Sequence, residues 1–347
     1  MEPRASPAGT PGSEPAPRTW AAPRAWGPWL RRWGISTVSL IGGLLTLFVF
    51  RRELTHIQWF VGSILLIWIL FAVLTQVRQA LETRGHRLVI TAADYLIQSL
   101  YHGVLLFLLP VYWASTTLTS INAPFLVLIV VLAILATFDP WYHVVVHPRP
   151  WTRYVFFLVS IFCGLNLALP LVGVPPHLAL AGAAWASVVA LTPSVCRARG
   201  WRWWFGLRTM AVAGVFVAVL AWWGRAVLPP VPLFIAQKMM AWPVAGDSLE
   251  PVAGAIHADD LRQRGLIAYT AIYAPAGLKQ SVRHVWRREG QVVDDVRLSP
   301  VRGGRREGFR TYSRKTAFPA DPSGRWVVDV VTGSDQLLGR LRFRVVP

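Results

Sequence analysis

The stretch Ala93–Trp113, ADYLIQSLYHGVLLFLLPVYW, decides the architecture of this chain. It is long enough to cross a bilayer, because about 20 residues of helix span roughly 30 Å of hydrocarbon. Similar apolar runs recur from Trp33 to about Leu228, and only the residues after them have the composition of a soluble domain. The whole chain is 54% hydrophobic and 15% charged, whereas a typical soluble protein has about 25% charged residues. We therefore predict a polytopic membrane protein with a C-terminal extramembrane module.

The apolar runs predict an α-helical membrane bundle of about seven transmembrane helices. The predicted spans are 33–50, 57–77, 92–114, 123–138, 153–172, 177–193 and 208–228. Before the membrane domain at 29–229, residues 1–28 are rich in Pro, Ala and Gly. This composition buries little apolar surface, so we expect a disordered cytoplasmic tail.

Arginines are distributed unevenly between the two sides of the predicted bundle. Fourteen lie in the tail or in loops on one side, and only Arg51 and Arg52 lie in the opposite short loops. The positive-inside rule makes the arginine-rich side cytoplasmic. With an odd number of spans, the C-terminal module would emerge outside the cytoplasm. Topology and a general arginine bias then account for much of the +18 formal charge, and nucleic acid is excluded as a partner.

The first half of Ala93–Trp113 carries polar side chains that a lipid-facing helix would not. Four of them share one helix face at about 100° per residue: Asp94, Gln98, Tyr101 and His102. We expect Asn166 of the fifth span to reach a depth similar to that of His102. Such a stripe must face other helices or a water-filled cavity. It forms either interhelical hydrogen bonds or a proton-relay, ion or headgroup site built from Asp94, His102 and Asn166.

A second polar group lies in Phe138–Trp151, FDPWYHVVVHPRPW. Asp139, His143 and His147 recur every four residues, which on one helix would align three possible metal ligands. The Asp-Pro pair is also a helix start, and Pro148 ends the segment. We interpret it as a short interfacial helix on the cytoplasmic side and predict no metal site.

The periodicity of the sequence changes to two after the last span. In Arg340–Val346, RLRFRVV, apolar and basic residues alternate, which is typical of a half-buried strand. Further strands are predicted at 266–274, 280–289, 291–298, 308–315 and 324–332. Turn-forming Gly, Pro and Asp residues separate them. Short strands without a helical period predict an all-β immunoglobulin-like sandwich at 265–347, joined to the bundle by a linker at 230–264.

Basic side chains cluster around one turn of this predicted module. The candidate anion-binding residues are Arg302, Arg305, Arg306 and Arg310. Arginine presents a bidentate fork to phosphate or carboxylate, so membrane lipid headgroups or an anionic polysaccharide would suit this turn. The alternative is a solvated strand face in an arginine-rich protein.

The C-terminal residues resemble a known bacterial module. The shared elements are an HVW strand, an R-x-x-S turn and a closing G-x-W…G…F-x-V pair. In this chain they are His284–Trp286, Arg310–Ser313, Gly324, Trp326, Gly339, Phe343 and Val345. This pattern is similar to a β-rich module catalogued only as a domain of unknown function, which a multi-span region accompanies in uncharacterised proteins. The resemblance implies a bacterial envelope membrane protein and supplies no catalytic residues.

Two functions remain open on this sequence. It contains no G-x-S-x-G, Walker or G-x-G-x-x-G motif and no zinc-ligand spacing, so we expect no cofactor and assign no catalytic residues. The first hypothesis is a multi-pass inner-membrane protein that presents a periplasmic binding module to an envelope protein, an anionic polysaccharide or a lipid. The second is a transporter or membrane-embedded enzyme that uses Asp94, Gln98 and His102 with Asn166.

Overall fold

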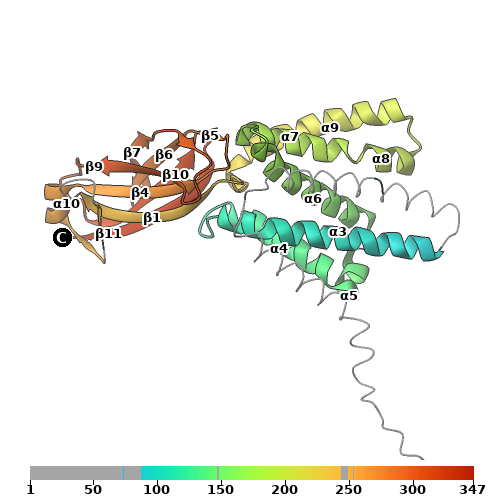
Figure 1. Ribbon diagram of the computed structural model, residues 1–347, viewed down its shortest axis with the longest axis horizontal. Helices are drawn as coiled ribbons and strands as arrows, with labels where there is room; N and C mark the ends of the chain where they lie inside the picture. Colours follow the sequence, from blue (N-terminus) through green and yellow to red (C-terminus); the bar gives the residue numbers. More distant parts are fainter. Residues whose placement is uncertain (1–72, 74–86, 147, 244–248, 253) are drawn as a thin grey trace, which may run out of the picture.

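The computed structural model describes residues 73, 87–146, 148–243, 249–252 and 254–347. The tail predicted at 1–28 and the span predicted at 33–50 lie outside these residues, as does the span predicted at 57–77 apart from residue 73. The described chain is elongated, with helices at one end and strands at the other (Figure 1). The protein therefore consists of a helical part and a strand-rich part, which follow one another in the sequence.

The helical part runs from Arg87 to Val227. Its elements are α3 (Arg87–Ala114), α4 (Ala123–Thr137), α5 (Asp139–Trp141), a π-helical turn η2 (Tyr142–Val146), α6 (Pro150–Leu171), α7 (Pro176–Val189), α8 (Thr192–Arg199), α9 (Trp203–Trp223) and a 3-10 turn η3 (Arg225–Val227). Four described helical segments are long and apolar enough to cross a membrane, or five if α4 and the bent segment after it are one span. The last five predicted spans therefore coincide with helices, whereas the total of seven stays a prediction.

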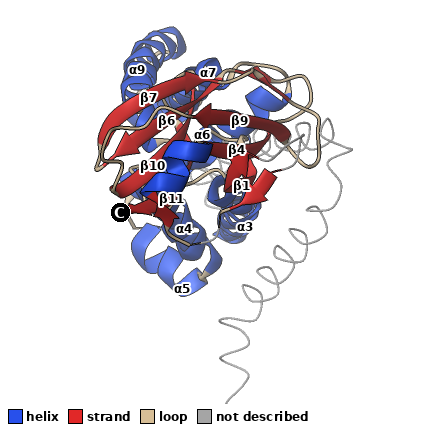
Figure 2. Ribbon diagram, turned by 90° about the vertical axis from the view of Figure 1, so that its left-hand side faces the viewer, coloured by secondary structure: helices blue, strands red, loops and turns tan. Residues whose placement is uncertain are grey.

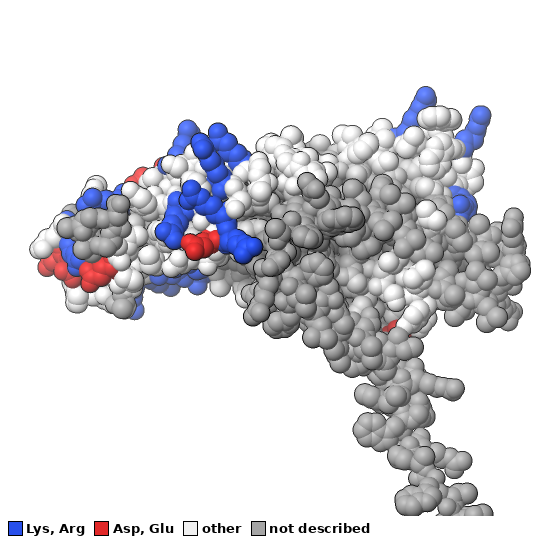
Figure 3. Space-filling model, viewed as in Figure 1, with Lys and Arg blue, Asp and Glu red and all other residues white. Residues whose placement is uncertain are grey.

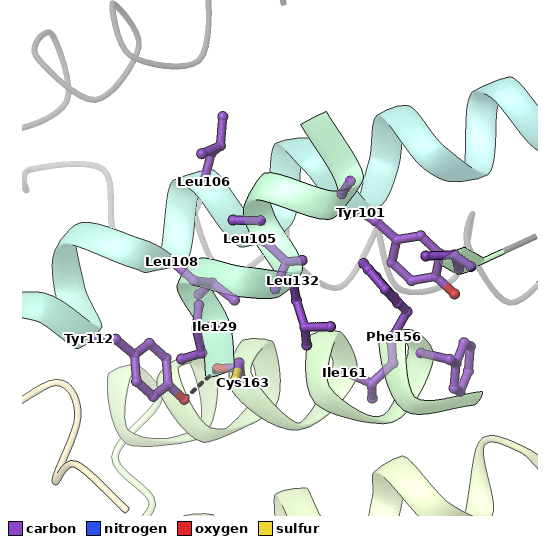
Figure 4. Close-up of a cluster of buried hydrophobic side chains, with 14 of the residues drawn as sticks. Tyr101, Leu105, Leu106, Leu108, Tyr112, Ile129, Leu132, Phe156, Ile161 and Cys163 are labelled. Atoms are coloured by element: carbon purple, nitrogen blue, oxygen red, sulfur yellow. Dashed lines mark hydrogen bonds between the residues drawn. The ribbon is translucent and has the colours of Figure 1, made fainter. Parts of the chain in front are cut away.

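Apolar side chains of α3, α4 and α6 form the core of the helical part (Figure 4). Leu105, Ile129 and Phe156 are among its fully buried members. On α9 the buried residues are Gly206 and Gly214, where the helix packs closely against Cys196 and Trp185, respectively. A side chain at either glycine would collide with these neighbours. Described residues leave most other α9 side chains uncovered, as suits an apolar helix surrounded by lipid.

We call Phe234–Val346 the β module. Its elements are β1 (Phe234–Pro243), β2 (Leu249–Pro251), β3 (Ile256–His257), α10 (Ala258–Arg264), β4 (Leu266–Tyr273), β5 (Lys279–Gln280), β6 (Val282–Arg288), β7 (Gln291–Arg297), β8 (Val301–Arg302), β9 (Phe309–Lys315), β10 (Gly324–Thr332) and β11 (Leu337–Val346). The six strands predicted from periodicity are confirmed as β4, β6, β7, β9, β10 and β11.

Two sheets of the β module share one core. The first has the order β2-β1-β4-β9 and the second β3-β11-β10-β6-β7, while β5 and β8 form a small separate pair. Figure 2 shows the main strands of the two sheets as two layers. Trp286, Trp326 and Val328 of the second sheet pack with Leu266 and Ala268 of the first, and all five are fully buried. Trp326 and Val328 of β10, like Leu266 and Ala268 of β4, are two residues apart and thus share the inner face of their sheet.

The stretch 230–264 differs from the predicted linker. It contains β1, β2, β3 and α10, and β1 pairs with β4 from Phe234 opposite Tyr273 to Ala241 opposite Ile267. A bulge lies between Ile235 and Gln237. Because a bulge shifts side chains to the other face, β1 lacks the strict alternation by which the other strands are recognised. The strands of the β module thus begin at Phe234 and not at residue 265.

Candidate functional site

The chain bends sharply where α4 ends. The axes of α4 and of the segment Asp139–Val146 differ by 100°. The 15 residues of α4 rise only about 22 Å, which is less than the hydrocarbon thickness of roughly 30 Å. Phe138 is extended, with φ −100° and ψ 103°. The bend leaves backbone carbonyl groups at the end of α4 without N–H donors from the same helix, so other groups must donate hydrogen bonds to these carbonyl oxygens.

Gln98 on α3 supplies one of these donors. Its buried side-chain Nε2 donates to the Ala136 carbonyl oxygen at 3.2 Å and to Asp139 Oδ1 at 2.6 Å. One amide thereby ties the last turn of α4 to the first residue of α5. Removing it would leave a buried carbonyl without this donor, which typically costs about 1–3 kcal/mol. Gln98 thus forms the kind of hydrogen bonds between helical segments that the first interpretation of the stripe predicts.

His102 lies one helical turn further along α3 and contacts the same end of α4. Its Nδ1 is 2.8 Å from Thr137 Oγ1, and both side chains are buried. The Thr137 hydroxyl donates to the Ala133 carbonyl oxygen at 2.7 Å, so it accepts a hydrogen bond from Nδ1–H. A neutral imidazole in this tautomer carries its lone pair on Nε2. The bend therefore brings the carboxyl group of Asp139 and the imidazole of His102 to the same end of α4.

Asn166 is not part of this group. Its Nδ2 lies 3.3 Å from the Tyr112 hydroxyl, which donates to the Cys163 carbonyl oxygen at 3.2 Å. Tyr112 lies ten residues further along α3 than His102, which corresponds to about 15 Å along the helix axis. Asn166 therefore contacts α3 at a different level from His102, and its depth in a membrane stays a prediction.

Tyr101 and Asp94 complete the predicted stripe. The Tyr101 ring packs against Phe156 with 5.4 Å between centroids, at the opposite end of the buried cluster from Tyr112 (Figure 4). Asp94 falls in the backbone of α3, but its side chain lies outside the described residues. The structure thus unites Gln98 and His102 and separates Asn166 from them.

The sequence pattern places Asp139 in another group, with His143 and His147, and it singles out neither Thr137 at the bend nor Tyr112 beside Asn166. The Phe-Asp-Pro sequence at 138–140 was the available signal, because proline at the second position of a helix starts a new helix after an apolar run. The partnership of Asp139 with Gln98 requires the bend itself, which no local pattern predicts.

The turn Gly333–Gln336 joins the β module to the end of α9. Arg225, just beyond α9, donates from Nε to the Ser334 carbonyl oxygen at 2.7 Å and from Nη2 to Asp335 Oδ2 at 3.2 Å. Gln336 Nε2 donates to the Leu228 carbonyl oxygen at 3.1 Å. These contacts hold the turn against the chain that leaves the helix.

A second contact joins the β module to the loop between α3 and α4. The fully buried Asn122 donates from Nδ2 to the Leu337 carbonyl oxygen at 3.3 Å. Arg342 Nη2 donates to Thr119 Oγ1 at 2.8 Å. With two separate attachments, the β module is docked on the helices and is not suspended from a flexible tether.

The basic turn lies between β8 and β9, and all four predicted anion-binding residues are exposed. Arg310 Nη2 forms an ion pair with Glu307 at 2.9 Å, and the Arg305 guanidinium lies over the Phe309 ring at 5.3 Å. Within the described part of the chain, Arg302 and Arg306 form no ion pair. Together with Arg305, the turn therefore presents three guanidinium groups that form no ion pair with a carboxylate of the described residues.

Comparison with known proteins gives family membership but no named relative. Residues 25–268 match the model of a family of unknown function, DUF5924, and residues 279–345 match a protein of unknown function, DUF2914. No curated protein and no solved structure matches the chain. The boundary between the two matches falls inside the β module: β1, β2, β3 and only the first three residues of β4 lie in the first match, whereas β5 to β11 lie in the second. The chain therefore belongs to the DUF5924 family of unknown function and carries a DUF2914 region at its C-terminal end.

Proposed function

We propose that this protein is a bundle of about seven transmembrane helices in the bacterial inner membrane that presents a docked binding module to the periplasm. The module would bind an envelope protein, an anionic polysaccharide or lipid headgroups through its basic turn. The observation that carries this proposal is the double attachment of the β module to the helices at Arg225 and Asn122. A rigidly held module keeps its exposed arginines at a fixed height above the bilayer.

Strand order supports an immunoglobulin-like fold for the module. In chain order, the long strands β1, β4, β6, β7, β9, β10 and β11 correspond to A, B, C, C′, E, F and G. The observed sheet orders then read A-B-E and G-F-C-C′, which is the arrangement of immunoglobulin-like sandwiches. Such modules commonly serve as binding domains, although the fold alone specifies no ligand.

The arginines of the helical part support the proposed orientation. Arg153 near the start of α6, Arg199 at the end of α8 and Arg202 before α9 lie at the helix ends remote from the β module. The positive-inside rule assigns those ends to the cytoplasm.

The bend between α4 and α5 favours a second candidate function, a transporter or membrane-embedded enzyme. Polar residues at discontinuous helices often form ion or proton sites in membrane proteins. Here Asp139 and the buried His102 would carry the proton, and the β module would be accessory.

Complementation of a strain that lacks the gene separates these functions. We expect a variant with Arg302, Arg305 and Arg306 all changed to Gln to lose complementation under envelope stress. Asp139→Asn combined with His102→Gln is expected to complement, because both amides retain the hydrogen-bonding groups that the bend uses. Immunoblots of the membrane fraction must give equal protein levels. Loss of complementation by the membrane pair alone would favour the second candidate.

A further inference from the structure

The basic turn belongs to a rim of the β module that adjoins the helices. We call the segments 274–281 and 297–310 the helix-proximal rim. The turn Gly333–Gln336, which contacts Arg225, also bonds to this rim, since Gly333 N–H donates to the Ser281 carbonyl oxygen at 2.8 Å. Lys279, two residues before Ser281, lies in β5, and its partner in the neighbouring strand β8 is Arg302. The rim therefore lies next to the exit of α9.

The exit of α9 marks the level of the membrane surface. Trp222 and Trp223 end this helix with 39% and 80% of their surface exposed, as expected of an interfacial aromatic belt. Arg225, two residues further on, already bonds to the β module. Little chain thus separates the interfacial tryptophans from the rim, and the rim faces the headgroup region of the same membrane.

Backbone packing holds the basic turn in a defined shape. Gly303 N–H donates to the Leu278 carbonyl oxygen at 2.9 Å, and Gly304 N–H donates to the Ala274 carbonyl oxygen at 3.1 Å. A side chain at Gly303 would collide with the Pro275 carbonyl, and Gly304 has φ +98°. Glycine is required at both positions. The turn thereby lies flat against 274–278 while the arginines beside it project into solvent.

Charge is distributed asymmetrically along the β module. The helix-proximal rim contains six basic residues and one acid, Glu307. The segments at the opposite end, 250–265, 289–290, 316–325 and 344–347, contain four basic residues and five acids. Figure 3 shows Lys and Arg gathered on the module beside the helices, and Asp and Glu at its opposite end. A general arginine bias would enrich both ends, so it does not explain the rim.

Ion pairs reinforce this difference. Four acids at the far end are paired with arginine: Asp259 with Arg262, Glu250 with Arg264, Asp321 with Arg288 and Glu289 with Arg325. On the rim, Glu307 with Arg310 is the ion pair that the described residues form. The positive charge of the helix-proximal rim is therefore largely unneutralised within the described residues and would attract anions from outside the chain.

We propose that the helix-proximal rim binds the phosphate groups of anionic phospholipids in the leaflet beneath it. Guanidinium forks match phosphate oxygens, and basic residues close to an anionic surface are strongly attracted to it. This inference rests on the proposed docking of the module but not on its periplasmic side. It names the same membrane, and not a soluble partner, as the primary ligand of the rim.

Hydrogen–deuterium exchange of the full-length protein in lipid nanodiscs tests the proposal. In phosphatidylglycerol-containing discs, we expect backbone amides of 297–310 to exchange roughly five- to tenfold more slowly than in phosphatidylcholine discs. High salt should reduce the difference, because it screens charge. Changing Arg302, Arg305 and Arg306 to Gln should abolish it. The matched control, Arg314, Arg325 and Arg344 changed to Gln, removes the same charge elsewhere and should leave it intact.

Three results would overturn the proposal. Equal exchange in both kinds of disc would mean that anionic lipid does not contact the rim. Equal loss in both triple variants would reduce the effect to net charge. Protection by heparin in phosphatidylcholine discs, without protection by phosphatidylglycerol, would assign the rim to a polysaccharide.

If the rim variant unfolds the module, exchange at 316–325 will rise as well. A variant with the same three arginines changed to Lys then replaces it and is expected to retain protection. A cytoplasmic module would contradict the proposed function while leaving this test valid.

Discussion

A fragment of residues 279–347 is expected to remain unfolded, whereas a fragment of residues 229–347 folds cooperatively. The shorter fragment matches the DUF2914 region but lacks β1, β2 and β4, which leaves β9 without its partner in the first sheet. Trp286 and Trp326 would then lose the opposite layer of their core. Circular dichroism and denaturant titration of the two fragments check this expectation.

The expected loss exceeds the stability of an ordinary domain. Each buried tryptophan removes roughly 150–250 Å² from water, which at about 25 cal/mol per Å² corresponds to roughly 4–6 kcal/mol. Exposing both, together with the remaining inner face, outweighs the 5–15 kcal/mol by which a domain is typically stable. A cooperative transition of the 279–347 fragment at the midpoint of the longer one would contradict this account of the core.

Acidification from pH 7 to pH 4 is expected to lower the unfolding free energy of the β module by about 3 kcal/mol through His284. Burial lowers the pKa of His284 from 6.5 to about 4. Below pH 6.5 the unfolded chain therefore binds a proton that the folded chain refuses. The contribution is fully present above pH 6.5 and is lost as the pH falls toward 4. Urea titrations of the 229–347 fragment across this range measure it.

The surroundings of His284 explain why it stays neutral. Its Nδ1 lies 2.9 Å from Ser313 Oγ and its Nε2 lies 3.2 Å from Thr270 Oγ1, with the ring fully buried between the sheets. Trp286 Nε1 donates to the same Ser313 hydroxyl at 3.1 Å. Both hydrogen-bond partners of the ring are neutral hydroxyl groups that cannot compensate the charge of an imidazolium, so protonation opposes folding.

Two variants isolate the histidine from other titrating groups. His284→Gln should flatten the dependence between pH 6.5 and 4, whereas His257→Gln, at an exposed position, should leave it unchanged. Hydrogen bonds to neighbouring backbone and hydroxyl groups lower the pKa values of Glu289 and Asp321, so their contributions are lost at lower pH still. An unchanged slope in His284→Gln would assign the acid sensitivity to other groups.

Periodicity predicted those parts of the fold in which one face is buried along its whole length. Six strands and five helices follow from their patterns, because alternation or a long apolar run determines which side meets the core. β1 escaped prediction because its bulge at Ile235–Gln237 interrupts the alternation. The local sequence pattern therefore does not predict a strand such as β1, which is identified only by its pairing with the neighbouring strand β4.

The candidate sites needed information that only the tertiary structure contains. Helical spacing correctly grouped Gln98 with His102 on α3, but their partners Asp139 and Thr137 approach through the 100° bend. The arginines around Gly303 were visible in the sequence as a cluster. Their location beside the helices follows from strand direction and from the contacts of Arg225, which composition does not reveal.

Reporter fusions after Arg264 test the central claim, that the docked β module lies outside the cytoplasm, most directly. Alkaline phosphatase becomes active only outside the cytoplasm of a bacterium. Ordinary green fluorescent protein becomes fluorescent only if the fusion leaves it inside the cytoplasm. The account predicts phosphatase activity without fluorescence. Fluorescence without phosphatase activity would contradict the proposed topology and place the helix-proximal rim against the cytoplasmic leaflet.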